Sequence, residues 1–173
     1  WPDRMREDSF IAEQFERYAF DGVNSRTVSS LKPIALLEGD HAEQLRLGSP
    51  FVRYGDWQRW YPGAHVIQQI EDHGKTVVLV RTGDTSAPAR TLYIDLEKGG
   101  LLAEDNVTFV EMLGRIGQHV EFGDYRDVSG MLLPFRTEIT YAHSLIGTIS
   151  TTVTDFELGV ELPDGVFELA SDL

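Results

Sequence analysis

The sequence has no cysteine among its 173 residues. This absence excludes disulfide bonds, thiolate metal sites and cysteine nucleophiles together, because each of them needs a thiol sulfur. It also gives no indication of the redox state of the compartment. Without disulfide bonds or thiolate metal sites, the fold must depend on its apolar core. A chain of this length fits one ordinary domain with a sizeable core, and we predict a single domain over residues 1–173.

Long apolar runs are missing as well. The longest are of the kind "TVVLV", far below the roughly 20 residues that a membrane-spanning helix needs. No stretch has the charged, apolar and small-residue order of a signal peptide. Because the numbering starts at Trp1 and not at a methionine, we expect a trimmed or excised segment of a longer chain.

Basic residues are few: 15 Lys and Arg stand against 28 Asp and Glu, which gives a formal charge of −13. None of the basic residues follows Arg136. A field of this sign repels phosphate backbones and anionic lipid head groups. The composition therefore argues against nucleic acid as a partner.

Motifs for catalysis and cofactor binding are also absent: there is no G-x-S-x-G, Walker or dinucleotide-binding fingerprint. The histidines do not have the i, i+4 spacing that presents two imidazoles to one metal. They are His41, His65, His73, His119 and His143. Ser29 and Lys32 match the S-x-x-K pattern of acyl-transfer enzymes, but they precede Pro33 in a β context without the partner motifs. We expect no metal, no cofactor and no enzymatic activity.

What the chain does contain is a period-two pattern of Val, Ile, Thr, Tyr and Phe between Gly and Asp turns, which predicts a mainly β protein. Successive runs are joined by short turns, so they predict antiparallel hairpins. The hairpins are "EQFERYAF" with "RTVSSL", "VIQQIE" with "KTVVLVRT", and "ARTLYIDL" with "GLLAEDNVTFVEML". Three further long runs follow, "GQHVEFGDYRDV", "MLLPFRTEITY" and "IGTISTTVTDFEL".

One segment differs from this pattern. Asp40 followed by Glu43 is a capping-box pair, and Gly48 and Pro50 are stop signals, so we predict a helix from Asp40 to Leu47. The next dozen residues hold five aromatic side chains, which need a large apolar surface to cover them. They are Phe51, Tyr54, Trp57, Trp60 and Tyr61.

The stretch "GDYRDVSGMLLPFRTEITY" combines charges with a strand-like run. Asp124 or Asp127 could act as a general acid or base with a pKa tuned by Arg126. The alternative, which we favour, is an exposed strand with cross-strand charge pairing. After the turn, alternation places Leu133, Phe135, Thr137, Ile139 and Tyr141 on one face, which predicts that this face is buried. Pro134 cannot donate to a strand ladder, so it predicts a strand start or an edge.

Taken together, several segments resemble the bacterial lipoprotein-carrier family of LolA-like and LolB-like proteins, also described as outer membrane lipoprotein-sorting proteins. The matching segments are "LLEGDHAEQLRLGSPF", "YPGAHVIQQIEDHGKTVVLVRTGD", "RTLYIDLEKGGLLAED" and "DYRDVSGMLLPFRTEI" closing on "VELPDGVFEL". They span about Glu16 to Leu169 and correspond to the family's lid helix, two hairpins, a strand pair and a terminal segment. The family's amino-terminal helix and strands are not visible, and no residue aligns with its functional arginine.

The resemblance implies a fold that is mainly β with minor α: a curved antiparallel meander forming a half-open barrel whose concave face is covered by a short helix. It also implies a non-enzymatic carrier or sensor in the periplasm or cell envelope. The ligand would be apolar, such as an acyl chain or a lipoprotein. Candidate cavity residues are Trp57, Trp60, Tyr61, Phe109, Phe122, Leu133, Phe135, Ile139 and Tyr141.

Two other readings of the sequence stay open. The same apolar residues also suit an ordinary filled core. The chain is alternatively a non-catalytic accessory domain of a larger extracytoplasmic enzyme or assembly, which binds a protein partner through an open sheet edge. An independent enzyme ranks last, because the sequence offers no acid-base or metal constellation.

Overall fold

The computed structural model describes residues 4–11, 13–48, 61, 63–82, 89–110 and 113–169, without the side chains of residues 11, 40, 43 and 46–48. Two compact units divide the chain. The first unit combines Trp1–Trp60 with Gly159–Leu173, and the second is Tyr61–Leu158. The prediction of a single domain stays a prediction.

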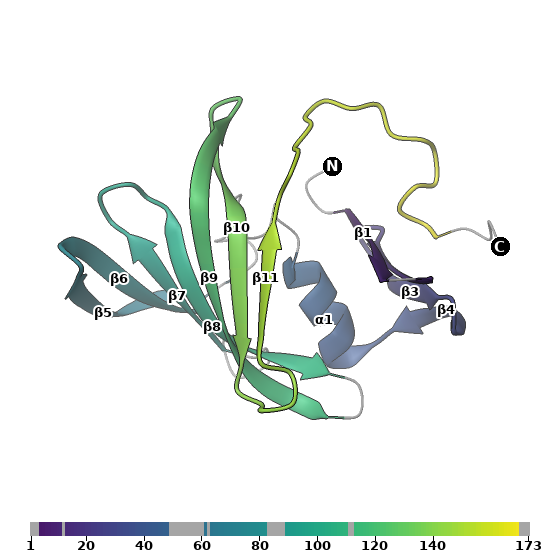
Figure 1. Ribbon diagram of the computed structural model, residues 1–173, viewed down its shortest axis with the longest axis horizontal. Coiled ribbons are helices and arrows are strands. Elements are labelled where there is room, and N and C mark those ends of the chain that lie inside the picture. The colour runs from purple at the N-terminus through teal and green to yellow at the C-terminus, as the bar shows by residue number, and fades with distance from the viewer. Residues whose placement is uncertain are drawn as a thin grey trace. The chain divides into compact units, whose positions relative to one another are not determined.

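The first unit holds a four-stranded antiparallel sheet in chain order (Figure 1). Its strands are β1 (Met5–Ile11), β2 (Gln14–Phe20), β3 (Ser25–Ser29) and β4 (Lys32–Leu37). The predicted hairpin corresponds to β2 and β3, and the structure adds a strand on each side of it. Ala19, Val28 and Leu169 form a small core with Phe15 packed against them. The carboxy-terminal Leu169 thereby packs against residues of the amino-terminal sheet.

The predicted helix is confirmed as α1 (Gly39–Gly48). It begins one residue before the predicted start, and Gly39 adopts a positive φ of 57° at the junction with β4. The end at Gly48 agrees with the stop signal read from the sequence, because glycine is favoured where a helix terminates.

The second unit holds a seven-stranded antiparallel sheet, whose strands follow one another along the chain (Figure 1). Its strands are β5 (His65–Asp72), β6 (Lys75–Thr82), β7 (Arg90–Asp95), β8 (Leu101–Val110), β9 (Gly114–Val128), β10 (Met131–Tyr141) and β11 (Thr148–Thr152). The predicted hairpins of this region are confirmed. Between β5 and β6, His73 and Gly74 both have positive φ, 49° and 77°, as a two-residue turn of the tightest hairpins requires.

The last strand is shorter than predicted. The sequence pattern runs on to Leu158, but β11 ends at Thr152, after which one more backbone bond joins Val153 to Phe135. Pro134 lies inside β10 and not at its start, opposite Tyr125 of β9. At this point β10 no longer has a residue of β11 paired with it.

The fold class read from the sequence is confirmed: antiparallel β-structure predominates, helix is minor, and the larger sheet is a curved meander. Its outer strands are β5 and β11, and they do not pair with each other in the described part of the chain. The sheet is therefore open at both edges and is not a closed barrel.

Candidate ligand-binding face

The strand register of the larger sheet defines two faces, because residues directly opposite one another on neighbouring strands point to the same side. Ile139 of β10 is opposite Val120 of β9, which is opposite Glu104 of β8. Glu104 is opposite Leu92 of β7, and Leu92 is opposite Val80 of β6. We call the side that carries this row the Phe135 face, and the other side the His119 face.

The Phe135 face is apolar along β9 and β10. Phe122, Leu133 and Phe135 are each 7% exposed, and Val120 is 1% exposed. Leu132, the neighbour of Leu133 on the His119 face, is 45% exposed. The alternation predicted for β10 is thereby confirmed, and it places a set of buried apolar side chains on one side of the sheet.

Five of the predicted cavity residues share this face. Ile139 belongs to the row that defines the face, and Phe122 lies on the adjacent strand β9, two residues from Val120 of that row. Leu133, Phe135 and Tyr141 follow the same alternation along β10. Burial raises the pKa of Tyr141, because the phenolate loses hydration there. The structure gathers these five side chains, and their contact with a ligand stays a prediction.

Of the other four predicted residues, the structure places one on the opposite face of the sheet. Phe109 is opposite Arg115 and falls on the His119 face, because β8 keeps its alternation through the hairpin. Tyr61 is the first residue of the second unit, and its side chain is buried. Trp57 and Trp60 lie outside the described residues.

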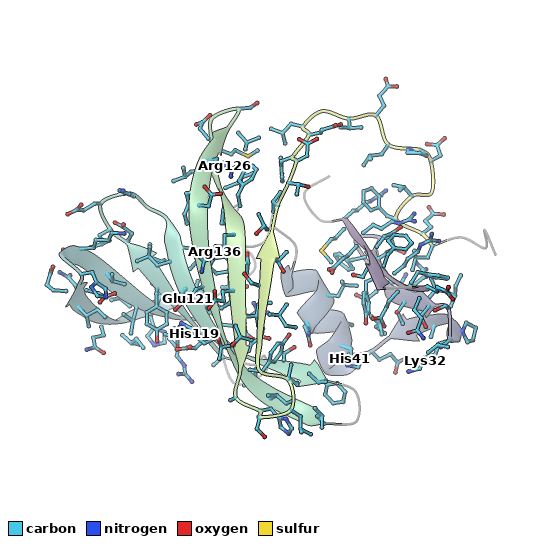
Figure 2. The ribbon with its side chains drawn as sticks, viewed as in Figure 1. Lys32, His41, His119, Glu121, Arg126 and Arg136 are labelled. Atoms are coloured by element: carbon cyan, nitrogen blue, oxygen red, sulfur yellow. The ribbon has the colours of Figure 1, made fainter. Side chains whose placement is uncertain are left out.

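The charged stretch "DYRD" is solvated, as we favoured. The Arg126 guanidinium lies 2.5 Å from the Asp124 carboxylate, and both side chains are about half exposed. The expected charge pairing across strands is not found here, because the residue opposite Arg126 is the uncharged Leu133. Arg126 pairs instead with Asp124 of its own strand, β9. Arg126 lowers the pKa of Asp124 by its hydrogen bond and charge. It also lies 4.4 Å over the Phe135 ring, at one end of the apolar face (Figure 2).

A group of buried polar side chains interrupts the Phe135 face on β6, β7 and β8. Arg90 Nη1 donates to Glu104 Oε1 at 2.7 Å, and the two side chains are 8% and 1% exposed. Asn106 Nδ2 donates to the same carboxylate oxygen. The backbone N–H of Arg90 donates to Thr82 Oγ1 at 3.3 Å. The sequence interpretation missed this group. The signal for it is a charged residue on each of two adjacent strands, at a position where the alternation predicts a buried side chain.

The His119 face carries a second polar cluster, which is partly exposed (Figure 2). Tyr93 donates to Asp105 at 2.6 Å, and His119 Nδ1 lies 2.6 Å from the other oxygen of that carboxylate. The hydrogen bond to Asp105 raises the pKa of Tyr93 to about 12. His119 Nε2 also lies 3.7 Å from Glu121. This network joins β7, β8 and β9.

Two other sequence candidates are parts of turns. Ser29 Oγ accepts hydrogen bonds from the backbone N–H groups of Leu31 and Lys32, so this hydroxyl closes the β3–β4 turn. His143 Nδ1 accepts from the N–H of Leu145 in the turn after β10. In the described parts of the chain, no three His, Asp or Glu side chains are grouped so that they could hold a metal ion.

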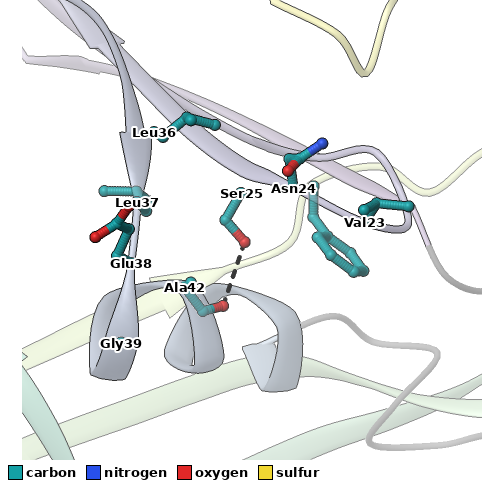
Figure 3. Close-up of a pocket in the computed structure, with 9 residues that line it drawn as sticks. Val23, Asn24, Ser25, Leu36, Leu37, Glu38, Gly39 and Ala42 are labelled. Carbon is teal, nitrogen blue, oxygen red and sulfur yellow. Dashed lines mark hydrogen bonds between the residues drawn. The ribbon is translucent and has the colours of Figure 1, made fainter.

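The first unit has a pocket of about 300 Å³ between the β4–α1 junction and the β2–β3 turn (Figure 3). Phe20, Leu37 and Ala42 contribute to its lining, with Glu38 beside them. The Ser25 hydroxyl donates to the carbonyl of Ala42 at 3.3 Å and ties the sheet to the helix. The lining combines these apolar side chains with the single carboxylate of Glu38.

The comparison with solved structures bears on the fold. A LolA superfamily protein from Nitrosomonas europaea superimposes with a TM-score of 0.52 at 13% identity, over 95% of this chain and 86% of that one. A putative outer membrane lipoprotein-sorting protein domain from Vibrio parahaemolyticus gives a TM-score of 0.51 at 10% identity, over 90% of this chain and 77% of that one. The chain has a LolA-like fold.

Sequence comparison adds no family to this result. No protein-family profile matches the chain, and no curated protein matches it. The LolA-like fold extends over nearly all of the chain, so it includes the four strands that precede α1. Among the described residues, no helix has the length and apolarity to cross a membrane.

Proposed function

We propose that the chain is a non-enzymatic carrier or sensor of the periplasm or cell envelope, which binds a lipid-like ligand on the Phe135 face. The observation that carries the proposal is that Phe122, Leu133 and Phe135 share one face of an open, curved sheet and are each only 7% exposed. The similarity to a lipoprotein-sorting domain supports it at the level of the fold.

The energetics of such a ligand are favourable. Each methylene that leaves water contributes about 0.8 kcal/mol, so a chain of a dozen carbons binds well even after its own ordering is counted. The Asp124–Arg126 pair leaves the end of the face polar. That end suits a water-facing part of the ligand.

Native mass spectrometry of gently purified protein, followed by lipid extraction, tests the proposal. We expect an apolar ligand in stoichiometric amount. A neutral fluorescent probe such as N-phenylnaphthylamine should bind the emptied protein, and Phe135→Asp should abolish that binding. Ile139→Asn provides a milder second variant, because Ile139 is only half-buried.

Leu132→Asp is the matched control, since this exposed leucine lies on the His119 face of the same strand. Each variant is checked by circular dichroism for its fold. A ligand-free protein that binds no probe, or equal losses in Phe135→Asp and Leu132→Asp, contradicts the proposal.

A second candidate function is an accessory domain that binds a protein by strand addition. It is favoured by β11, an edge strand whose five residues are all exposed and whose Ile149 is 45% exposed. Exposed edges of this kind pair readily with another chain. Native mass spectrometry distinguishes the two functions, because the accessory function predicts a bound protein and no lipid.

A further inference from the structure

Glu104 lies in the middle of the row that defines the Phe135 face, between Val120 and Leu92. It is fully buried, with 0% of its surface exposed. A carboxylate at such a position is rare, because charged groups are seldom buried without complete pairing.

The pairing of this carboxylate is incomplete. Its Oε1 atom accepts hydrogen bonds from Arg90 and from Asn106. Its Oε2 atom has no hydrogen-bond partner among the described residues and less than 1 Å² of accessible surface. A carboxylate oxygen accepts about two hydrogen bonds, so one side of Glu104 is saturated and the other is bare.

The chemistry that is missing is a neutral donor. Arg90 already balances the negative charge of Glu104 at 2.7 Å. A second cation would leave an uncompensated positive charge in a buried site, and a second anion would be repelled. A hydroxyl or an amide N–H supplies the hydrogen bond without adding charge.

We propose that Glu104 Oε2 accepts a hydrogen bond from a neutral hydroxyl or amide N–H of the bound ligand. The ligand class is then an amphiphile with a neutral hydrogen-bond donor, whose chain lies along Phe122, Leu133 and Phe135 while its donor meets Glu104. This inference rests on the proposed function, since it names the class of ligand for the same face. The ligand displaces the side chains that close the oxygen from water.

Two probes of equal length test the donor requirement on the unmodified protein. Both 1-dodecanol and methyl undecyl ether have thirteen non-hydrogen atoms, and only the alcohol can donate. Their affinities are measured by displacement of N-phenylnaphthylamine in 0.5 M NaCl, where long-range charge effects are screened. We expect the alcohol to bind at least about tenfold more tightly than the ether, as for one hydrogen bond to a charged group.

Dodecylamine and dodecanoate complete the series, and both should bind more weakly than the alcohol. The variant Glu104→Gln tests the residue. Its amide oxygen stays with Arg90 and Asn106, so an N–H replaces the bare acceptor. Alcohol and ether can both accept from that N–H, and their affinities should then agree within about twofold. Glu121→Gln makes the same chemical change on the His119 face and should keep the preference for the alcohol.

The outcomes separate the two proposals. If none of the four probes binds the unmodified protein, the proposed function fails and the inference fails with it. If alcohol and ether bind equally well, or the amine binds best, the neutral-donor site is wrong while the apolar face stands. A preference that persists in folded Glu104→Gln overturns the assignment to Glu104. The comparison on the unmodified protein decides the donor question even if this variant does not fold.

Discussion

Replacing Arg90 with methionine tests whether the buried ion pair is as isolated from water as the structure shows. The variant keeps a long, flexible side chain but removes the charge that faces Glu104. The two side chains are 8% and 1% exposed, and their atoms lie 2.7 Å apart. Loss of one partner of such a pair costs about 3–5 kcal/mol, because the remaining charge stays buried without compensation.

That cost is a large part of the roughly 5–15 kcal/mol that stabilises an ordinary domain. Urea unfolding followed by circular dichroism measures it as a lower transition midpoint. The double variant Arg90→Met with Glu104→Met removes both charges and should recover most of the loss. Recovery will be incomplete by about 1 kcal/mol, because Asn106 loses its acceptor.

Arg136→Met is the matched control. Arg136 pairs with Glu138 at 2.9 Å, but its side chain is 59% exposed. Exposed pairs contribute about 0–1 kcal/mol, so this variant should unfold close to the unmodified protein. An Arg90→Met variant that loses less than about 1 kcal/mol, or a double variant no more stable than Arg90→Met alone, refutes the account of a buried pair.

Three further predictions concern other parts of the molecule. Gly74→Val should destabilise the β5–β6 hairpin by about 1–2 kcal/mol in thermal unfolding, because φ is 77° there and a β-branched residue resists it; an unchanged midpoint contradicts this. Burial alone would raise the pKa of Asp21, but hydrogen bonds from Asn24, Arg26 and Val23 lower it to about 2. The contribution of the ionised Asp21 to the free energy of unfolding is therefore present above about pH 4 and is lost as the pH falls towards 2. In Asp21→Asn the free energy of unfolding should depend less on pH in this range, and an unchanged pH dependence contradicts this. The hydrogen bond to Asp105 raises the pKa of Tyr93 to about 12. An NMR titration of Tyr93 in the Asp105→Asn variant should therefore show a pKa closer to 10, and an unchanged pKa would contradict the assigned cause.

The hairpins of the second unit could be predicted because local signals agree with the final packing. "DHG" between β5 and β6 supplies the two residues with positive φ that the turn needs. The alternation of β10 is equally clear, since Leu133 and Phe135 are buried and Leu132 is exposed. In both cases the information lies within a few residues of sequence.

Other features depend on which strand lies beside which, and the sequence does not state that. β11 ends at Thr152, opposite Arg136 of β10, although its own period-two pattern runs on to Leu158. The predicted site lists Phe109 with Phe122, but the register of β8 places Phe109 on the His119 face. Arg90 was missed because its partner Glu104 is fourteen residues away and across a turn. Long-range register therefore limited both the fold and the site.

Methyl NMR of the protein during a titration with 1-dodecanol tests the central claim most directly, because it reports each position without mutation. The account predicts shifts at Ile116, Val120 and Leu133, which line the Phe135 face, and unchanged signals at Val107 and Leu132 on the His119 face. Shifts confined to Val107 and Leu132, or no shifts at saturating alcohol, would contradict it.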